Sequence, residues 1–276
     1  MSPRRGRGLS GKAASRALVA LQALCVLGPV AIIVVWAFTA SWPWPSLLPE
    51  TLSARGVEEL FGPAQRLTDV LGTSVGIALA TAVLTTTVAA LAGRALSRCR
   101  FAGREVFRFA VLTPFLIPAT VFAMGVQVAF IRAGLAGTVA GVVVSHVIVA
   151  LPYASLIMVD AMEAAGSRLE EQARLCGAGS ARTWATVILP VLAPSLLSAA
   201  SMSYILSFSQ YFITLLVGAG KVKTLALVMF PYLAGGDRTI ASAYGVVFLA
   251  ATLIVFLLFE VLLRKQASRE IDYFNG

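Results

Sequence analysis

Few residues in this chain could carry out chemistry, and they do not gather into a reactive site. His146 is the only histidine, and the three cysteines lack metal-ligand spacing. The segment GRGLSGK, residues 6–12, matches the first seven positions of a phosphate-binding loop. However, Ala13 replaces the hydroxyl residue that would bind Mg²⁺, and no strand precedes the segment. We therefore expect this chain to hold no nucleotide, metal or other cofactor and to have no enzymatic activity of its own.

The composition is that of a membrane protein. The chain has 276 residues, of which 58% are hydrophobic and only 13% are charged, whereas a soluble domain is about a quarter charged. Apolar runs long enough to cross a hydrocarbon core of roughly 30 Å recur along the chain. Long continuous runs favour helices over a membrane barrel, whose strands alternate in polarity. We therefore predict an all-α, polytopic membrane protein with one membrane domain over residues 17–263.

Six apolar runs define the predicted membrane spans. They cover residues 17–39, 68–92, 109–131, 138–159, 195–217 and 241–263. Pro114 and Pro118 should kink the third span or delay its start. In the second span, Gly72, Gly76 and Ala80 are spaced by four and indicate a face for close helix packing.

Positive charges lie beside these spans. The net charge is +9, and basic residues cluster in residues 1–16, between the second and third spans, and in residues 264–276. The positive-inside rule places these segments in the cytoplasm, so both tails should be cytoplasmic. A surface for nucleic acid is the alternative interpretation. Because the clusters adjoin membrane spans, we expect no nucleic-acid partner.

A charged segment with two glycines, Glu171–Pro194, interrupts the chain between the fourth and fifth spans. Apolar residues recur at helical spacing from Met162 to Cys176. Gly177 and Gly179 should end that helix, because glycine accepts a positive φ. Ser180 is a plausible N-cap for a second helix. The pattern predicts a helix, a glycine turn and a helix on the cytoplasmic side, packed on the protein's own inner surface or in another protein's groove.

This segment resembles the EAA loop of permease subunits in binding-protein-dependent ABC importers. The family pattern is Glu-Ala-Ala, three residues and a glycine, followed at a distance by an Ile-x-Leu-Pro-like end. The matching residues here are Glu171, Ala173, Gly177, Ile188, Leu189 and Pro190, with Gln172 in place of the first alanine and Trp184 at a position that is often aromatic. The resemblance covers about residues 60–263 and looks closest to the polyamine, iron, thiamine and phosphonate branch.

The resemblance implies a type I ABC importer fold and a role in transport. The loop of residues 161–193 would be a coupling-helix pair that docks on a separate ATPase subunit, which would hold ATP and Mg²⁺. The expected partners are two ATPase subunits, a second permease subunit that is identical or homologous, an extracytoplasmic substrate-binding protein and membrane lipid. The chain would lie in a bacterial inner membrane with both termini cytoplasmic. The expected substrate is a small solute such as spermidine or putrescine.

Individual residues of the loop suit docking. Gly177 would allow a sharp turn, and Trp184 would be a large apolar anchor. Glu171 could pair with Arg174 or with a cation on the ATPase. The alternative is an amphipathic helix that lies on lipid, but such helices favour basic residues, and this one mixes signs.

Polar residues inside the spans are candidates for the transport pathway. Ser207, Ser209, Gln210 and Tyr211 form a polar run in the fifth span, which lines the pathway in related importers. His146 falls within the fourth span. These side chains could face substrate, or they could form hydrogen bonds that hold helices together.

A transporter driven by an ion gradient is the alternative function. That class usually places carboxylates near the membrane midplane. Here Asp69, Asp160 and Glu260 all fall near the ends of predicted spans, which argues against it.

Overall fold

The computed structural model describes the backbone of residues 7–43, 45–62 and 66–275, and the side chains of these residues apart from 7–13, 112, 114, 115, 119 and 263–275. The chain divides into two compact units. The first contains residues 1–67 and 229–249, and the second contains residues 68–228 and 250–276.

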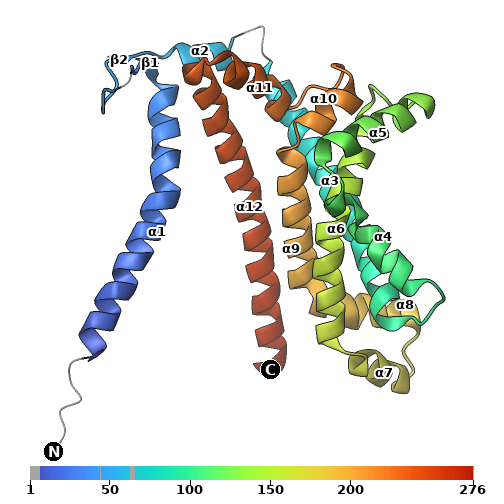
Figure 1. Ribbon diagram of the computed structural model, residues 1–276. Helices are drawn as coiled ribbons and strands as arrows, with labels where there is room; N and C mark the ends of the chain where they lie inside the picture. The colour runs from blue at the N-terminus through green and yellow to red at the C-terminus, as the bar shows by residue number, and fades with distance from the viewer. Residues whose placement is uncertain (1–6, 44, 63–65, 276) are drawn as a thin grey trace, which may run out of the picture. The chain divides into compact units, whose positions relative to one another are not determined.

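The first unit begins with a long apolar helix. Its elements are α1 (Arg7–Ala37), β1 (Thr39–Ser41), β2 (Thr51–Leu52), α2 (Arg55–Leu60), the end of α11 (Leu225–Gly235) and the start of α12 (Arg238–Asn275) (Figure 1). Residues 7–12 are helical, so the described part of the GRGLSGK segment does not form the loop that binds phosphate in such a motif. The antiparallel pair β1–β2 was not predicted, because strands of two or three residues show no recognisable period.

Polar contacts fix the start of α12 within the first unit. Arg55 Nη2 lies 2.7 Å from both carboxylate oxygens of Asp237. One of these oxygens also accepts a hydrogen bond from the Ile240 N–H at 3.2 Å, which caps the helix. The Thr239 hydroxyl donates to the Thr39 carbonyl at 2.6 Å, so the short sheet and α12 are joined directly.

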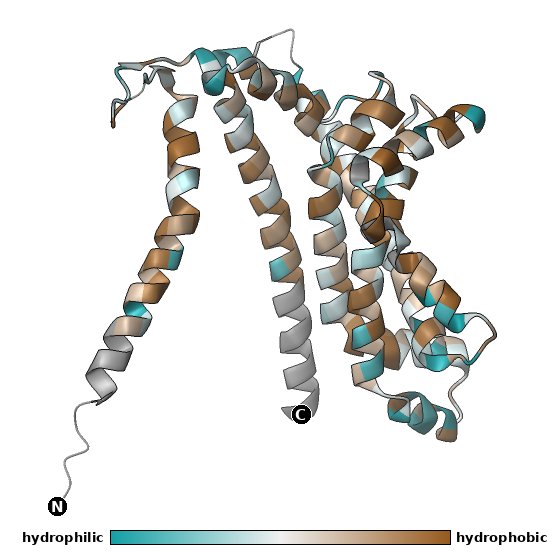
Figure 2. Ribbon diagram, viewed as in Figure 1, coloured by the Kyte–Doolittle hydropathy of each residue, from teal (hydrophilic) through white to brown (hydrophobic). Residues whose placement is uncertain are grey.

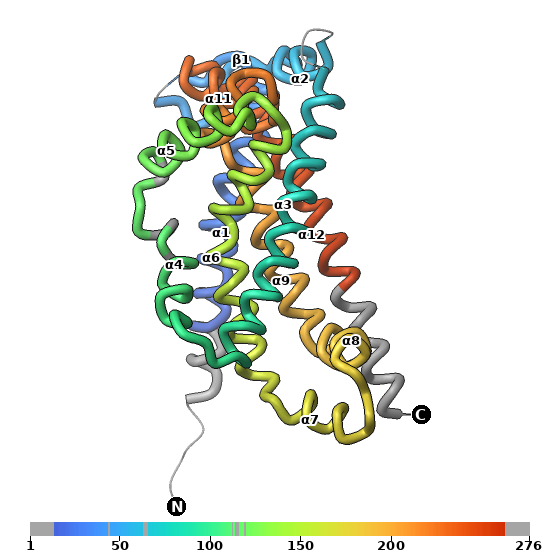
Figure 3. Tube along the Cα trace, turned by 90° about the vertical axis from the view of Figure 1, so that its right-hand side faces the viewer, coloured from blue at the N-terminus to red at the C-terminus, as the bar shows by residue number. Residues whose placement is uncertain are grey.

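The second unit contains most of the membrane helices. Its elements are α3 (Leu67–Arg98), α4 (Arg104–Leu116), α5 (Ala119–Arg132), α6 (Val139–Ala165), α7 (Arg168–Leu175), α8 (Ser180–Thr183), a π-helical turn (Trp184–Ile188), α9 (Leu189–Phe208), α10 (Phe212–Gly218), the start of α11 and the end of α12. Helix α6 packs along α9, and α10 packs against α5 and α6. Helices α7 and α8 lie at the end of α6 and α9 opposite to α5 (Figures 1 and 3).

Helices α3 and α6 approach closely at Gly93. A Cβ atom placed on Gly93 would lie 3.0–3.1 Å from the backbone and Cβ of Met158, so a larger residue would push the helices apart. Gly72, Gly76 and Ala80 are instead exposed, and no heavy atom lies within 4 Å of a Cβ built on either glycine. The small-residue face predicted in this helix therefore makes no close packing within the described chain.

Among the residues that the structure describes, five helices are long and apolar enough to cross a membrane. They correspond to the first, second, fourth, fifth and sixth predicted spans, and their apolar character is visible in Figure 2. The third predicted span is divided into α4 and α5. Ile117 has an extended backbone (φ −97°, ψ 129°), as expected for a residue that precedes proline, here Pro118. The expected kink is therefore a complete break.

The fifth span differs from the predicted range of 195–217. Helix α8, the π turn and α9 form one continuous helix over residues 180–208. Pro190 is the second residue of α9, and Pro194 also lies inside this continuous helix. Proline has no N–H and its ring crowds the preceding turn. The wider π turn, in which the Leu189 N–H donates to the Trp184 carbonyl, accommodates this disruption.

Candidate functional site

The connection between α6 and α9, residues 166–190, is here called the turn segment. Helix α6 ends at Ala165, and Gly166 (φ +66°) changes the chain direction before α7 begins at Arg168. The prediction of one helix from Met162 to Cys176 is therefore wrong. The apolar spacing continues across Gly166, but glycine takes a left-handed conformation without steric cost, and the spacing cannot reveal this.

Backbone hydrogen bonds close the turn after α7. Gly177 has a φ of +81°, and its N–H donates to the Arg174 carbonyl at 2.9 Å. The Ala178 N–H donates to the Ala173 carbonyl at 3.0 Å. These two bonds form a Schellman motif, in which glycine is the favoured residue. The predicted role of Gly177 in ending the first helix is confirmed.

The second helical piece begins at Gly179 rather than at the predicted N-cap, Ser180. Gly179 occupies the capping position (φ −68°, ψ 159°), and Ser180 is the first residue of α8. The Thr183 hydroxyl donates to the Gly179 carbonyl at 3.1 Å. Further along, Ile188 is buried, whereas Leu189 and Pro190 are exposed.

The exposed surface of the turn segment carries charges and one large apolar side chain. Glu171 is exposed, and its side chain makes no ion pair within the described chain, so the suggested pair with Arg174 is not formed. Ala173 is half-buried. Leu175, the last residue of α7, is 88% exposed beside the exposed Gly177. The sequence analysis did not identify Leu175. The available signal was an apolar residue that lies outside the buried face of an otherwise polar helix.

Trp184 is half-buried rather than exposed as the predicted anchor would be. Its ring packs against a buried apolar cluster that includes Ile188. The guanidinium of Arg94 lies 4.9 Å from the ring centroid, a cation–π distance. These contacts attach the second helical piece to its own membrane helices, and the role of Trp184 as an anchor on the ATPase stays a prediction.

Two arginines of α3 meet a buried glutamate that sequence reasoning passed over. Glu170 is 8% exposed. Its carboxylate oxygens lie 3.8 Å from Arg94 Nη2 and 3.6 Å from Arg98 Nε. The available signal was the spacing of the two arginines, which places them one turn apart on the same helix face.

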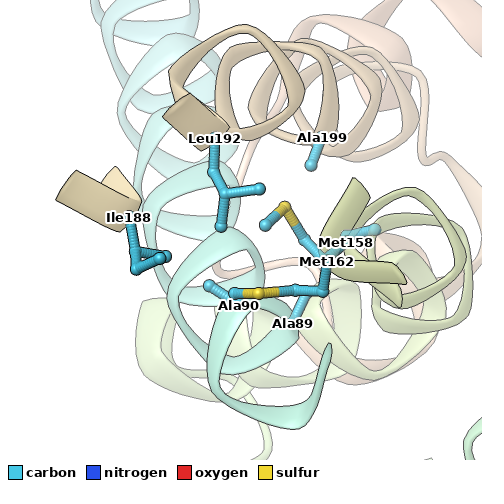
Figure 4. Packing of buried hydrophobic residues seen from close by; sticks show 8 residues of the cluster. Ala89, Ala90, Met158, Met162, Ile188, Leu192 and Ala199 are labelled. Carbon is cyan, nitrogen blue, oxygen red and sulfur yellow. The ribbon is translucent and has the colours of Figure 1, made fainter. Parts of the chain in front are cut away.

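An apolar core lies beneath the turn segment (Figure 4). Ile188 and Leu192 from the π turn and α9 pack with Met158 and Met162 of α6 and Ala89 of α3, each at most 2% exposed. Between membrane helices, van der Waals contacts of this kind stabilise the packing. The segment therefore continues a packed block of three membrane helices.

His146 lies in a buried polar cluster. Its Nδ1 is 2.8 Å from the Ser207 hydroxyl, and its Nε2 is 3.0 Å from the Thr214 hydroxyl. The Ser207 hydroxyl is also 3.2 Å from that of Thr81. All four side chains are at most 4% exposed. Helices α3, α6, α9 and α10 are thus joined by hydrogen bonds, which favours the packing interpretation for His146 and Ser207.

The remaining polar run lies at a break between α9 and α10. Residues 209–211 are not helical. Ser209 is exposed, and its hydroxyl donates to the Ile205 carbonyl at 2.9 Å, while Gln210 and Tyr211 are half-buried. Non-helical backbone at membrane depth is tolerated against protein or beside a water-filled cavity. Of the predicted pathway residues, these three are accessible. Among the described residues, no group of three or more His, Cys, Asp or Glu side chains is placed to hold a metal ion.

Known proteins share this architecture. The chain is 25% identical over 193 residues to the spermidine/putrescine transport system permease protein PotC of Haemophilus influenzae, covering 70% of this chain and 75% of that protein. It is 26% identical over 243 residues to the trehalose transport system permease protein SugB of Mycobacterium tuberculosis, with coverages of 84% and 88%. The fold is similar to a chain in the crystal structure of a bacterial ABC transporter involved in the import of the acidic polysaccharide alginate. There the TM-score is 0.67 at 19% identity, over 94% of this chain and 99% of that one.

The family match includes the turn segment. Residues 86–268, more than half of the chain, match the family described as the binding-protein-dependent transport system inner membrane component. The resemblance inferred from the EAA-like loop is therefore confirmed, and the relatives are named for different substrates. The chain belongs to the binding-protein-dependent inner membrane components, the permease subunits of ABC importers.

Proposed function

We propose that this chain forms the substrate pathway of its importer and that the turn segment couples that pathway to ATP hydrolysis by a separate ATPase subunit. The observation that supports the proposal most directly is that an exposed turn is attached to closely packed membrane helices. Glu171, Leu175 and Gly177 are exposed, while Trp184 and Ile188 attach the same segment to the membrane helices.

The proposed mechanism is mechanical. Closure of two ATPase subunits on ATP would displace the docked turn, and the attached helices would rotate between inward-open and outward-open states. The turn segment suits this role because the Gly177 turn is closed by two backbone hydrogen bonds, and the core beneath it leaves little freedom for the segment to yield. Leu175 would supply the apolar contact to the ATPase, and Glu171 would supply a charge.

The proposed assembly has two ATPase subunits, this permease, a second identical or homologous permease and an extracytoplasmic substrate-binding protein. The five long apolar helices support a multi-pass location in the inner membrane. The basic segments at both ends support cytoplasmic termini. The ATPase subunits would hold ATP and Mg²⁺.

The proposed substrate is a small polar solute that passes the break between α9 and α10. Ser209, Gln210 and Tyr211 are the accessible polar residues there. A relative named for spermidine and putrescine and one named for trehalose are similarly close in sequence. A polyamine is therefore the predicted substrate to test first, and a disaccharide is the competing class of substrate.

The coupling role can be tested by a proline substitution. Gly177→Pro forces φ to about −65° where the structure has +81° and removes the N–H that donates to Arg174. Gly179→Pro is the matched control, because Gly179 already has a φ of −68°. In a complex reconstituted with the ATPase and a ligand-loaded binding protein, we expect Gly177→Pro to abolish stimulated ATP hydrolysis and uptake. Membrane insertion of both variants should match that of the wild-type chain.

Uptake by Gly177→Pro at the wild-type rate would contradict the docking role. Uptake that needs no ATPase subunit and follows an imposed ion gradient would instead support a secondary transporter. The binding protein and ligand that give the largest stimulation would identify the substrate.

A further inference from the structure

Glu170 is the most buried charged residue of the turn segment. It lies in the first turn of α7 and is 8% exposed, whereas the adjacent Glu171 is exposed. A carboxylate at this depth requires a compensating charge. The charges come from α3, which is more than sixty residues away in sequence.

Arg94 and Arg98 both reach Glu170, and each also contacts a second part of the same region. Arg98 Nη2 donates to the Met162 carbonyl at 2.8 Å and to the Gly166 carbonyl, at the end of α6. Arg94 lies over the ring of Trp184. Two side chains of one helix therefore touch the end of α6, α7 and the start of the second helical piece.

The turn segment is linked to the membrane helices in two different ways, by covalent connection and by side-chain contacts. The turn segment is covalently continuous with α6 and α9, so both helices follow its motion directly. Helix α3 has no such link. Its close packing at Gly93 holds it to α6, and the ion pairs with Glu170 extend the attachment to α7.

We infer that Glu170 is a positioning residue that joins α3 to the turn segment, so that displacement of the turn also moves α3. This inference rests on the proposed function of the segment. The ion pairs are longer than hydrogen bonds, and both Glu170 Oε1 and Arg98 Nε lack a hydrogen-bond partner in the described structure. The attachment is therefore mainly a charge attraction. Removal of the carboxylate charge would leave two partly buried arginines without their counter-ion and would weaken the attachment.

Two natural cysteines can report on the attachment. Cys99 follows Arg98 at the end of α3, Cys176 lies on the turn, and both are exposed. In full-length chain carrying Cys25→Ser, nitroxide labels at Cys99 and Cys176 give the distribution of distances between α3 and the turn. We expect Glu170→Gln to widen that distribution. Glu163→Gln, at an exposed acidic residue of α6, is the matched control and should leave it unchanged.

A second variant separates the attachment from a folding defect. Arg94→Gln removes one ion pair and leaves the hydrogen bonds of Arg98 to α6 in place, and it should widen the distribution too. If Glu170 and Arg94 act through each other, the double variant Glu170→Gln with Arg94→Gln should give a distance distribution no wider than that of the broader single variant.

The unlabelled variants are then tested in the complete importer. With Glu170→Gln, we expect the ATPase to bind but its stimulation by ligand-loaded binding protein to fall about 5- to 150-fold, the range of coupling between distant sites. An unchanged distance distribution would overturn the attachment, and a wider one with normal stimulation would overturn the transmission role. Failure of the wild-type chain to bind an ATPase would overturn the proposed function, while the label distances would still decide the attachment.

Discussion

The polar cluster around His146 gives a quantitative test of whether it packs helices or meets substrate. The perturbation is His146→Leu, which keeps an apolar side chain in the space and removes both hydrogen bonds of the ring. Ser207 keeps its contact with Thr81, and Thr214 keeps its bond to the Gln210 carbonyl at 2.9 Å. The loss is therefore limited to the two bonds made by the histidine.

Hydrogen bonds between membrane helices contribute about 0.6 kcal/mol each on average and at most about 1.7 kcal/mol. Two such bonds predict that His146→Leu lowers the free energy of unfolding by about 1.2 kcal/mol, with an upper bound near 3.4 kcal/mol. A double-mutant cycle with Ser207→Ala should give a coupling energy of about 0.6 kcal/mol, because the two side chains share one bond.

The assay is reversible unfolding of the chain in mixed micelles by titration with a denaturing detergent, followed by uptake measurements in the assembled importer. We expect lower stability and an unchanged apparent affinity for substrate. Thr87→Val is the control, because the exposed Thr87 hydroxyl bonds only to the Val83 carbonyl of its own helix. Normal stability of His146→Leu together with an altered apparent affinity would refute the packing interpretation.

Two further tests use matched positions. Leu175→Ala should weaken binding of the ATPase subunit by about 1–2 kcal/mol, or roughly five- to thirtyfold in affinity. Leu47→Ala, at a leucine that is 90% exposed, should leave binding unchanged in the same pull-down titration. Gly93→Ala should lower the free energy of unfolding by about 1–3 kcal/mol through overpacking against Met158. Gly76→Ala on the same helix has open space and should raise stability by about 0.5–1 kcal/mol; equal effects at both glycines would contradict the close approach of α3 and α6.

The membrane architecture could be predicted because it depends on local composition. Apolar runs located the five helices of the described chain that are long enough to cross a membrane, whereas the third predicted span is divided between α4 and α5. Gly177 could be identified as a turn because a glycine ends an apolar helical pattern. The limits of the spans were less predictable near prolines. At Pro118 the preceding residue left the helix, whereas at Pro190 the helix continued through a π turn. Both outcomes are compatible with proline chemistry, and packing of the surrounding helices decides between them.

The attachment of the turn segment could not be predicted, because it depends on contacts between distant parts of the chain. Arg94 and Arg98 fit the positive-inside rule as simple topological charges, and nothing local shows that they face Glu170. Trp184 has the composition of an exposed anchor until the fold places Arg94 over its ring. In each case the sequence shows the type of the residue, but only the tertiary structure shows which residue it contacts.

Helix α7 has only eight residues, and an isolated helix of this length is unstable. Its geometry must therefore be imposed from outside. Gly166 and Gly177, both at positive φ, set the direction in which it enters and leaves, while Glu170 fixes its distance from α3. A change at either glycine should redirect the turn and abolish docking, whereas a change at Glu170 should leave the turn correctly shaped but loosely attached. Loss of docking and loss of transmission are thus separate defects: the first arises at the glycines that flank this short helix, and the second at its buried glutamate.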